Sequence, residues 1–178
     1  VLLEPGKKAA TDSKMWCYAN GKIGDKSIVL FEYKPTRKGA NAEEFLKGFR
    51  GYLVCDGYTG YNKVTGIKRC ACLAHIRRRF ADFIPKEKEL LKDSIAVKGL
   101  EYCNQLFLLE REYSGQDKDG RQIRKALSSE ERYTARQERT KPVLDAFYAW
   151  LESLPQTGNE KLRKSINYVL NEKKYMYT

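Results

Sequence analysis

Short apolar runs alternate with polar stretches along the first half of the chain. Residues 15–19 and 28–33 are rich in β-forming side chains, and the polar residues between them include glycine, which predicts a β-hairpin. The runs 52–55 and 67–73 have the length and composition of two further buried strands.

Helical segments are predicted between and after these strands. We expect Asn41 to cap a helix that ends at Gly51, a short turn or helix over 58–64, and another helix from about His75. This alternation of strands and helices is typical of parallel βαβ units, and the opening hairpin makes the predicted sheet mixed.

The second half of the chain has a different pattern. Apolar residues recur at helical spacing over 95–107, 143–154 and 162–170, and Ser128 and Glu131 have the spacing of a capping box. Pro142 either kinks one helix or separates two. The pattern predicts an α/β domain over residues 1–85 and a helical domain over 86–178 packed on it.

The charge of the chain is strongly positive and uneven. The net charge is +11, and residues 1–83 carry 16 Lys and Arg against 8 Asp and Glu. A basic half of this kind suits a polyanion such as nucleic acid, but it also suits a plain soluble surface. No apolar run approaches the roughly 20 residues of a membrane span, so no membrane partner is expected.

One carboxylate stands directly after a predicted buried strand. Asp56 follows residues 52–55 and precedes Gly57. An acid fixed at a strand end suits a hard cation such as Mg²⁺, and glycine lets a phosphate approach the backbone. Asp-Gly is also a common turn pair, and the spacing alone favours the turn.

Cysteine and histidine raise the question of a zinc site. Cys70, Cys72 and His75 follow one another closely, but structural zinc normally has four ligands, and His75 is the only histidine in the chain. Buried thiols explain the pattern better. The odd number of five cysteines also favours reduced thiols in a cytosolic compartment.

Several other side chains have two possible roles. The arginines after His75 could hold phosphate or cover a solvated helix face. Tyr58 and Tyr61 could stack on bases or pack at the strand end, and packing is the stronger expectation. A second group of arginines could follow DNA or pair with neighbouring acids on the same helix, and pairing is the stronger expectation: Arg132, Arg136 and Arg139, with Glu130, Glu131 and Glu138.

Two blocks, EFLKGFRGYLVCDGYTGYN and CLAHIRRRF, resemble the transposases of the insertion-sequence-66 family. The stretches VLLEPGKKA, RYTARQERTKPVLDAFYAWL and LRKSINYVL are similar too and occur in the same order, so the likeness covers nearly the whole chain. The resemblance implies a DDE catalytic domain with a ribonuclease-H-like mixed sheet flanked by helices, and a helical insertion in the C-terminal half.

The resemblance also implies roles for particular residues. Asp56 aligns with the second catalytic acid of the family and would be a ligand of Mg²⁺ or Mn²⁺. A basic group near the active site would bind DNA, and its members are Arg37, His75, Arg77, Arg78 and Arg79.

The activity implied for the complete protein is DNA transposition by two-metal phosphoryl transfer. Water would attack a phosphodiester at the end of the mobile element, and the freed 3′-hydroxyl would attack target DNA. The expected partners are transposon ends, target DNA and further copies of the same protein, in the bacterial cytoplasm.

The position of the blocks suggests that the chain is one piece of such a protein. The first acid of the family is expected before Val1 and the catalytic Glu after Thr178. One acid of three would leave this piece inactive by itself. The alternatives are a non-catalytic basic domain that binds nucleic acid and, last, a zinc-stabilised interaction domain.

Overall fold

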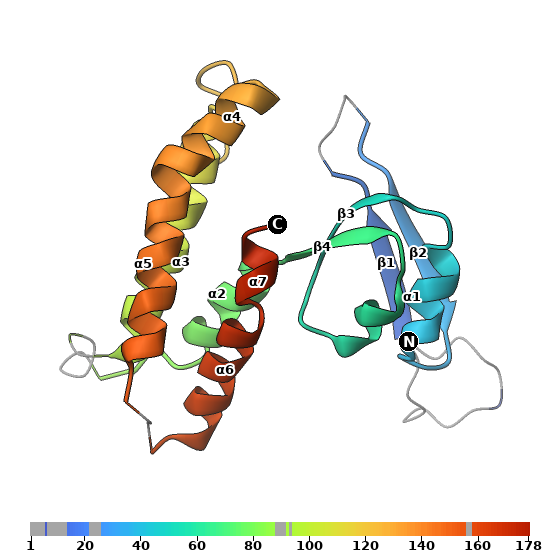
Figure 1. The fold of residues 1–178 in the computed structure, drawn as a ribbon, viewed down its shortest axis with the longest axis horizontal. Coiled ribbons are helices and arrows are strands. Elements are labelled where there is room, and N and C mark those ends of the chain that lie inside the picture. The colour runs from blue at the N-terminus through green and yellow to red at the C-terminus, as the bar shows by residue number, and fades with distance from the viewer. Residues whose placement is uncertain (1–5, 7–13, 22–25, 88–91, 93, 156–157) are drawn as a thin grey trace. The chain divides into compact units, whose positions relative to one another are not determined.

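The computed structural model describes residue 6 and residues 14–21, 26–87, 92, 94–155 and 158–178 (Figure 1). The chain falls into two compact units, Val1–Gly51 with Tyr58–Lys68, and Tyr52–Gly57 with Arg69–Thr178. No helix among the described residues is long and apolar enough to cross a membrane. The mixture of strands and helices confirms the predicted α/β class, while the predicted domain division at residue 85 stays a prediction.

The first unit contains the predicted hairpin. Strands β1 (Lys14–Ala19) and β2 (Val29–Lys34) pair antiparallel, with Cys17 opposite Phe31. The side-chain oxygen of Asn20 accepts a hydrogen bond from the Ile28 N–H at 2.7 Å, at the end of the ladder where the two strands are connected.

Helix α1 (Gly39–Phe45) differs from the prediction at both ends. Lys38 is its N-cap, and Asn41 lies inside the helix, where its amide donates to the Thr36 carbonyl at 2.7 Å. Packing sets the helix start, because a Cβ on Gly39 would lie only 2.5 Å from the carbonyl oxygen of Gly60. The helix ends at Phe45, well before Gly51, so both predicted helix boundaries were wrong.

Aromatic side chains form the core of the first unit. Trp16, Ala42 and Val64 are buried there, and the edge of Tyr61 meets Trp16 with ring centroids 6.2 Å apart. Tyr58 packs against Tyr61 in the same way at 5.7 Å, next to the 3₁₀ helix η1 (Thr59–Lys63). The expectation that both tyrosines pack is confirmed.

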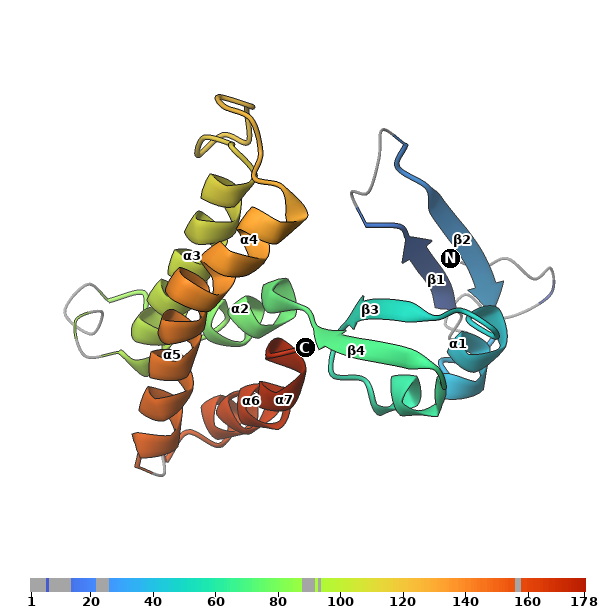
Figure 2. The same ribbon diagram turned by 45° about the horizontal axis from the view of Figure 1, so that its top comes forward.

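Strands β3 (Gly51–Cys55) and β4 (Ile67–Ala71) form a second two-stranded sheet, seen from the side in Figure 2. Gly66 lies next to the carbonyl of Phe49, and beyond the strands the Cys72 N–H donates to the Cys55 carbonyl at 2.9 Å. Both starts and both ends are therefore adjacent, so the two strands run parallel.

The predicted single mixed sheet is not confirmed. Among the described residues, β1 pairs with β2 and β3 with β4, and no ladder joins the two pairs. The ribonuclease-H-like arrangement therefore stays a proposal.

Helices make up most of the second unit: α2 (Leu73–Ala81), α3 (Ile95–Tyr113), α4 (Ser129–Ala135), α5 (Lys141–Ser153), α6 (Glu160–Asn171) and α7 (Lys173–Met176). The predicted capping box is confirmed, since Ser128 and Glu131 exchange both hydrogen bonds. Pro142 lies in the first turn of α5, directly after the π-helical turn η3 (Arg136–Thr140). The helix therefore continues through Pro142, because the ordinary hydrogen-bond ladder is already interrupted there.

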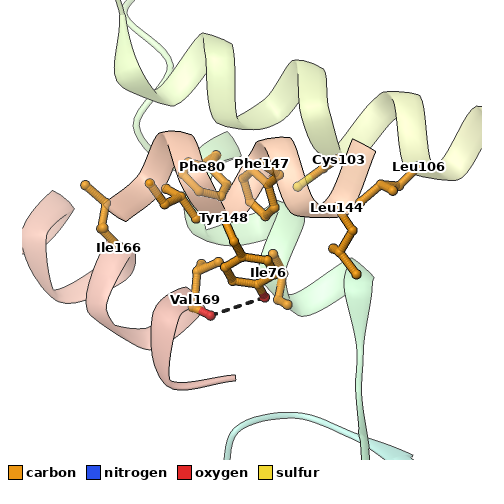
Figure 3. Close-up of a cluster of buried hydrophobic side chains, with 10 residues drawn as sticks. Ile76, Phe80, Cys103, Leu106, Leu144, Phe147, Tyr148, Ile166 and Val169 are labelled. Carbon is orange, nitrogen blue, oxygen red and sulfur yellow. Dashed lines mark hydrogen bonds between the residues drawn. The ribbon is translucent and has the colours of Figure 1, made fainter. Parts of the chain in front are cut away.

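The core of the second unit lies where α2, α3, α5 and α6 meet (Figure 3). Phe80, Phe147 and Val169 are fully buried, and the helical spacing predicted this for Phe147 and Val169. Helices α2 and α3 approach closely because Gly99 has no side chain, and a Cβ there would lie 2.3 Å from the Phe80 ring. This contact fixes the helix that carries the predicted arginine cluster.

Candidate functional site

Asp56 is the first residue after strand β3 and is half-buried. Because β3 and β4 run parallel, the turn that follows Asp56 does not close a β-hairpin. The plain hairpin interpretation of Asp-Gly is therefore excluded. Ligands of open parallel sheets bind outside the carboxyl ends of the strands, and Asp56 stands at such an end.

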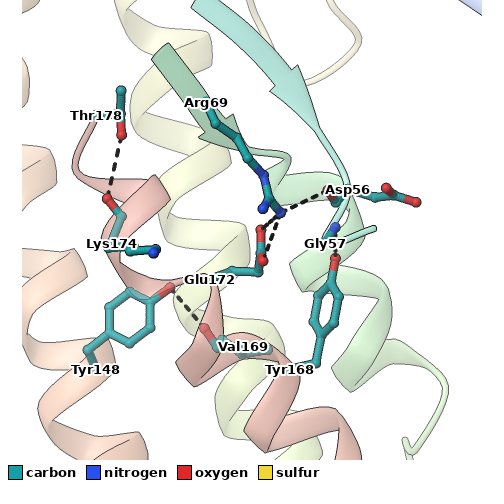
Figure 4. A network of polar contacts seen from close by, with 9 residues as sticks. All are labelled: Asp56, Gly57, Arg69, Tyr148, Tyr168, Val169, Glu172, Lys174 and Thr178. Carbon is teal, nitrogen blue, oxygen red and sulfur yellow. Dashed lines mark hydrogen bonds and ion pairs between the residues drawn. The ribbon is translucent and has the colours of Figure 1, made fainter. Parts of the chain in front are cut away.

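Side chains from β4 and α6 hold the backbone on both sides of this residue (Figure 4). The Asp56 carbonyl accepts a hydrogen bond from Arg69 Nη2 at 3.1 Å. The Gly57 N–H donates to the hydroxyl of Tyr168 at 2.8 Å. The Asp56 carboxylate points away from Arg69 and Glu172 in the same view. The two contacts thus fix the backbone and direct the carboxylate away from the ion pair.

The hydrogen bond from Arg69 belongs to a buried ion pair. Arg69 Nη2 lies 2.9 and 2.8 Å from the two carboxylate oxygens of Glu172, and the two side chains are 8% and 7% exposed. The guanidinium also lies 4.1 Å from the centre of the Tyr175 ring. Burial, the largest single influence, would lower the pKa of Arg69, but the Glu172 carboxylate, Cys55 and Tyr175 together outweigh it and the pKa is raised. The charge of Arg69 is therefore neutralised inside the protein.

The neighbouring thiol is affected by the same environment. Burial raises the pKa of Cys55, although its hydrogen bond with Arg69 acts in the opposite direction. Cys55 is thus a buried, uncharged thiol, whereas Cys70 and Cys72, which were predicted to be buried, are only partly buried.

Gly57 is needed for close packing. A Cβ at this position would lie 2.4 Å from Cε2 of Tyr168, well inside the contact distance of the two atoms. Glycine therefore allows α6 to approach the end of β3 closely enough for the Tyr168 hydroxyl to accept the Gly57 N–H.

A complete metal site is not formed by these residues. The described part of the chain contains no group of three or more His, Cys, Asp or Glu side chains that could hold a metal ion. Asp56 supplies one carboxylate, and the nearby Glu172 is bound to Arg69. Mg²⁺ would need further oxygen ligands from other segments. The same finding counts against a zinc site at Cys70, Cys72 and His75.

The consecutive arginines of α2 do not form one track. Arg77 Nε donates to the side-chain oxygen of Asn104 on α3 at 2.8 Å, Arg79 lies over the Tyr168 ring at 4.0 Å, and Arg78 is exposed. Successive helical residues are about 100° apart around the axis, so their side chains diverge. The ring nitrogen Nδ1 of His75 is buried and has no hydrogen-bond partner among the described residues.

Arg37 belongs to the other unit, where its guanidinium lies 4.6 Å from the centre of the Tyr58 ring. The DNA-binding role predicted for Arg37 stays a prediction.

Two arginines of the second group, Arg136 and Arg139, form ion pairs, but with different partners from those predicted. The third, Arg132, donates a hydrogen bond from Nη2 to the Ser114 hydroxyl at 3.3 Å. Arg136 binds Glu110 through two hydrogen bonds of 2.7 and 2.8 Å, and Arg139 binds Glu112 through two of 2.8 Å. Both acids come from α3, which lies alongside the α4–α5 helix (Figure 1). Pairs between helices replaced the expected pairs within one helix, because Arg136 and Arg139 face α3.

Three residues of the site were not predicted from the sequence: Arg69, Tyr168 and Glu172. Only Arg69 could have been identified from the sequence, because a charged residue within a predicted buried strand requires a buried partner. Tyr168 and Glu172 are four residues apart and share a helix face, but nothing in the sequence connects that face with Gly57.

Comparisons with known proteins place the chain in a family. The model of the family described as "Transposase IS66 family" matches residues 1–178. The uncharacterized proteins y4jD and y4hP of Sinorhizobium fredii (strain NBRC 101917 / NGR234) are each 28% identical, over 94% and 90% of this chain. The alignments cover 33% and 31% of those proteins, so the chain spans about a third of their length. No solved structure matches the chain significantly.

The matched region contains β3, Asp56 and the helices that hold it, because the family model extends over the entire chain. The chain therefore belongs to the IS66 family of transposases.

Proposed function

We propose that this chain is part of the catalytic domain of a DNA transposase, and that Asp56 is one of its catalytic carboxylates. The observation that carries the proposal is the position of Asp56 at the carboxyl end of β3, with hydrogen bonds to the backbone on both sides. Family membership supports the reaction class. A fixed carboxylate at a strand end is what metal-assisted phosphoryl transfer requires.

The reaction proposed for the complete protein has two steps. Water attacks a phosphodiester at the end of the mobile element, the P–O3′ bond breaks, and the 3′-oxygen leaves as a hydroxyl. That hydroxyl then attacks a phosphodiester of target DNA, so one P–O bond forms as another breaks and no external energy source is needed. Asp56 would hold Mg²⁺ or Mn²⁺ together with carboxylates from segments beyond the described residues, in a DDE site on a ribonuclease-H-like fold.

The proposed partners are DNA and further copies of the protein. A net charge of +11 supports DNA, because neutralising phosphates releases counterions. The basic residues predicted to contact it are Arg37, His75, Arg77, Arg78 and Arg79. We also propose assembly into oligomers on paired transposon ends, in the bacterial cytoplasm.

A second candidate is a basic domain that binds nucleic acid without chemistry. The lack of a complete metal-binding cluster in the described part of the chain favours it. The two candidates differ in what Asp56 does, because a binding domain has no need of this carboxylate.

The test is strand cleavage by the full-length protein with Mg²⁺ or Mn²⁺ on DNA carrying a transposon end. Asp56→Asn should abolish cleavage and leave DNA binding intact, whereas Asp82→Asn, an exposed acid after α2, should retain both. Unchanged cleavage by Asp56→Asn would support the binding domain. The 178-residue chain alone should show no cleavage, and robust nicking lost on Asp56→Asn would contradict its expected inactivity.

A further inference from the structure

A groove of about 690 Å³ lies between α2 and α3. The two helices are in contact at Phe80 and Gly99. The groove lies between them nearer the start of α2, next to Ala74 and Leu108. Its volume lies in the range of sites that bind small organic ligands. The groove belongs entirely to the second unit.

The charge of the groove is positive. Arg77 and Arg111 both line it, and none of the described residues that line it is acidic. The described part of the chain provides no ion pair for either guanidinium, in contrast to Arg136 and Arg139 on the neighbouring helix. Two uncompensated guanidinium groups in one concave site favour a phosphate.

The remaining lining suits a planar, partly apolar group. Leu108 is 60% exposed and, with Phe107, gives the groove an apolar wall. Asn104 and Gln105 add side-chain amides, and Asn104 accepts the Arg77 Nε hydrogen bond that orients the guanidinium. An apolar wall beside amides and arginines matches a nucleobase with its phosphate.

We propose that this groove binds an unpaired segment of a DNA strand, with a phosphate between Arg77 and Arg111 and a base against Leu108. Duplex DNA presents its phosphates outward and keeps its bases stacked inside, so it would leave the apolar wall uncovered. The proposal rests on the proposed function for the identity of the nucleic acid. It adds a single-strand site outside the surroundings of Asp56.

The test is fluorescence anisotropy of a labelled single-stranded oligonucleotide and of the matching duplex with the 178-residue chain. Arg77→Ala/Arg111→Ala should weaken single-strand binding about tenfold or more and lower the salt slope by about 0.7 per arginine. Leu108→Ala should weaken it about fivefold without changing the salt slope, because only an uncharged apolar contact with the base is lost.

Arg163→Ala is the matched control, an exposed arginine on α6 outside the groove. It should leave single-strand affinity within about twofold of wild type. Arg111→Ala alone keeps the Arg77–Asn104 hydrogen bond and should still weaken binding, so loss of folding in the double variant would not mask the result.

Three results would overturn the proposal: no single-strand binding by the chain, an equal loss of duplex and single-strand affinity in the double variant, or displacement of the oligonucleotide by inorganic phosphate at equal concentration. Asp56→Asn separates this proposal from the proposed function. It should abolish cleavage by the full-length protein and leave single-strand binding unchanged, so each proposal can fail without the other.

Discussion

Arg69 and Glu172 form an ion pair 2.8 Å long, with both side chains more than nine-tenths buried, and the same guanidinium binds the carbonyl of Asp56. The pair joins β4 to the end of α6, about 100 residues later in the chain. Stability of the fold and the position of the candidate catalytic residue therefore depend on one guanidinium.

Removing one charge of this pair should be costly. Glu172→Gln leaves the buried guanidinium uncompensated and should lower the free energy of unfolding by about 3–5 kcal/mol, measured by urea denaturation. Glu152→Gln breaks an exposed pair with Lys173 and should cost about 1 kcal/mol or less. Equal losses in the two variants would show that the buried pair has no special role.

A methyl group at Gly57 should separate α6 from the end of β3. Gly57→Ala should destabilise the protein by about 1–3 kcal/mol, because its Cβ would overlap the Tyr168 ring. In a Tyr168→Ala background the same change should cost almost nothing, which a double-mutant cycle measures as coupling. Gly21→Ala is the control, since no atom lies within 4 Å of its added Cβ. Additive effects at Gly57 and Tyr168 would contradict the contact.

Stability should fall at alkaline pH through a buried thiol. Burial raises the pKa of Cys103 from 9.0 to about 12, so the native state keeps a proton that the unfolded state releases. The stabilisation is fully present below pH 9 and is lost between pH 9 and 12, at up to about 1.4 kcal/mol per pH unit.

Urea denaturation at several pH values between 8 and 11 measures this effect. Cys103→Ala should reduce the slope of the free energy of unfolding against pH by the equivalent of about one released proton. Cys17→Ala, at an exposed cysteine, should leave this slope unchanged. Identical slopes in wild type and Cys103→Ala would contradict the assignment.

Local patterns in the sequence predicted most elements and few of the contacts between them. The β1–β2 hairpin, the Ser128 cap and the buried faces of the long helices follow from neighbouring residues alone. The start of α1 does not follow from neighbouring residues, because the close approach of Gly39 and Gly60 sets where the helix begins. Asn41 is a good capping residue, but it does not cap this helix.

The candidate site shows the same limit. The neighbours of Asp56 showed an acid at a strand end and the family resemblance assigned its role, while its supports on α6 come from residues more than 100 positions away. The three arginines after Ile76 looked like one cluster in sequence, but the helical turn sends Arg77 and Arg79 to different partners. Distances in sequence do not determine which side chains converge.

The role proposed for Asp56 is that of a metal ligand in a strand-transfer site. Asp56→Cys in the full-length protein tests it most directly, because a thiolate binds Mg²⁺ poorly and softer ions better. We predict no strand cleavage with Mg²⁺ and partial cleavage with Mn²⁺, measured on DNA carrying a transposon end. Cleavage at the wild-type rate with Mg²⁺ would contradict the claim.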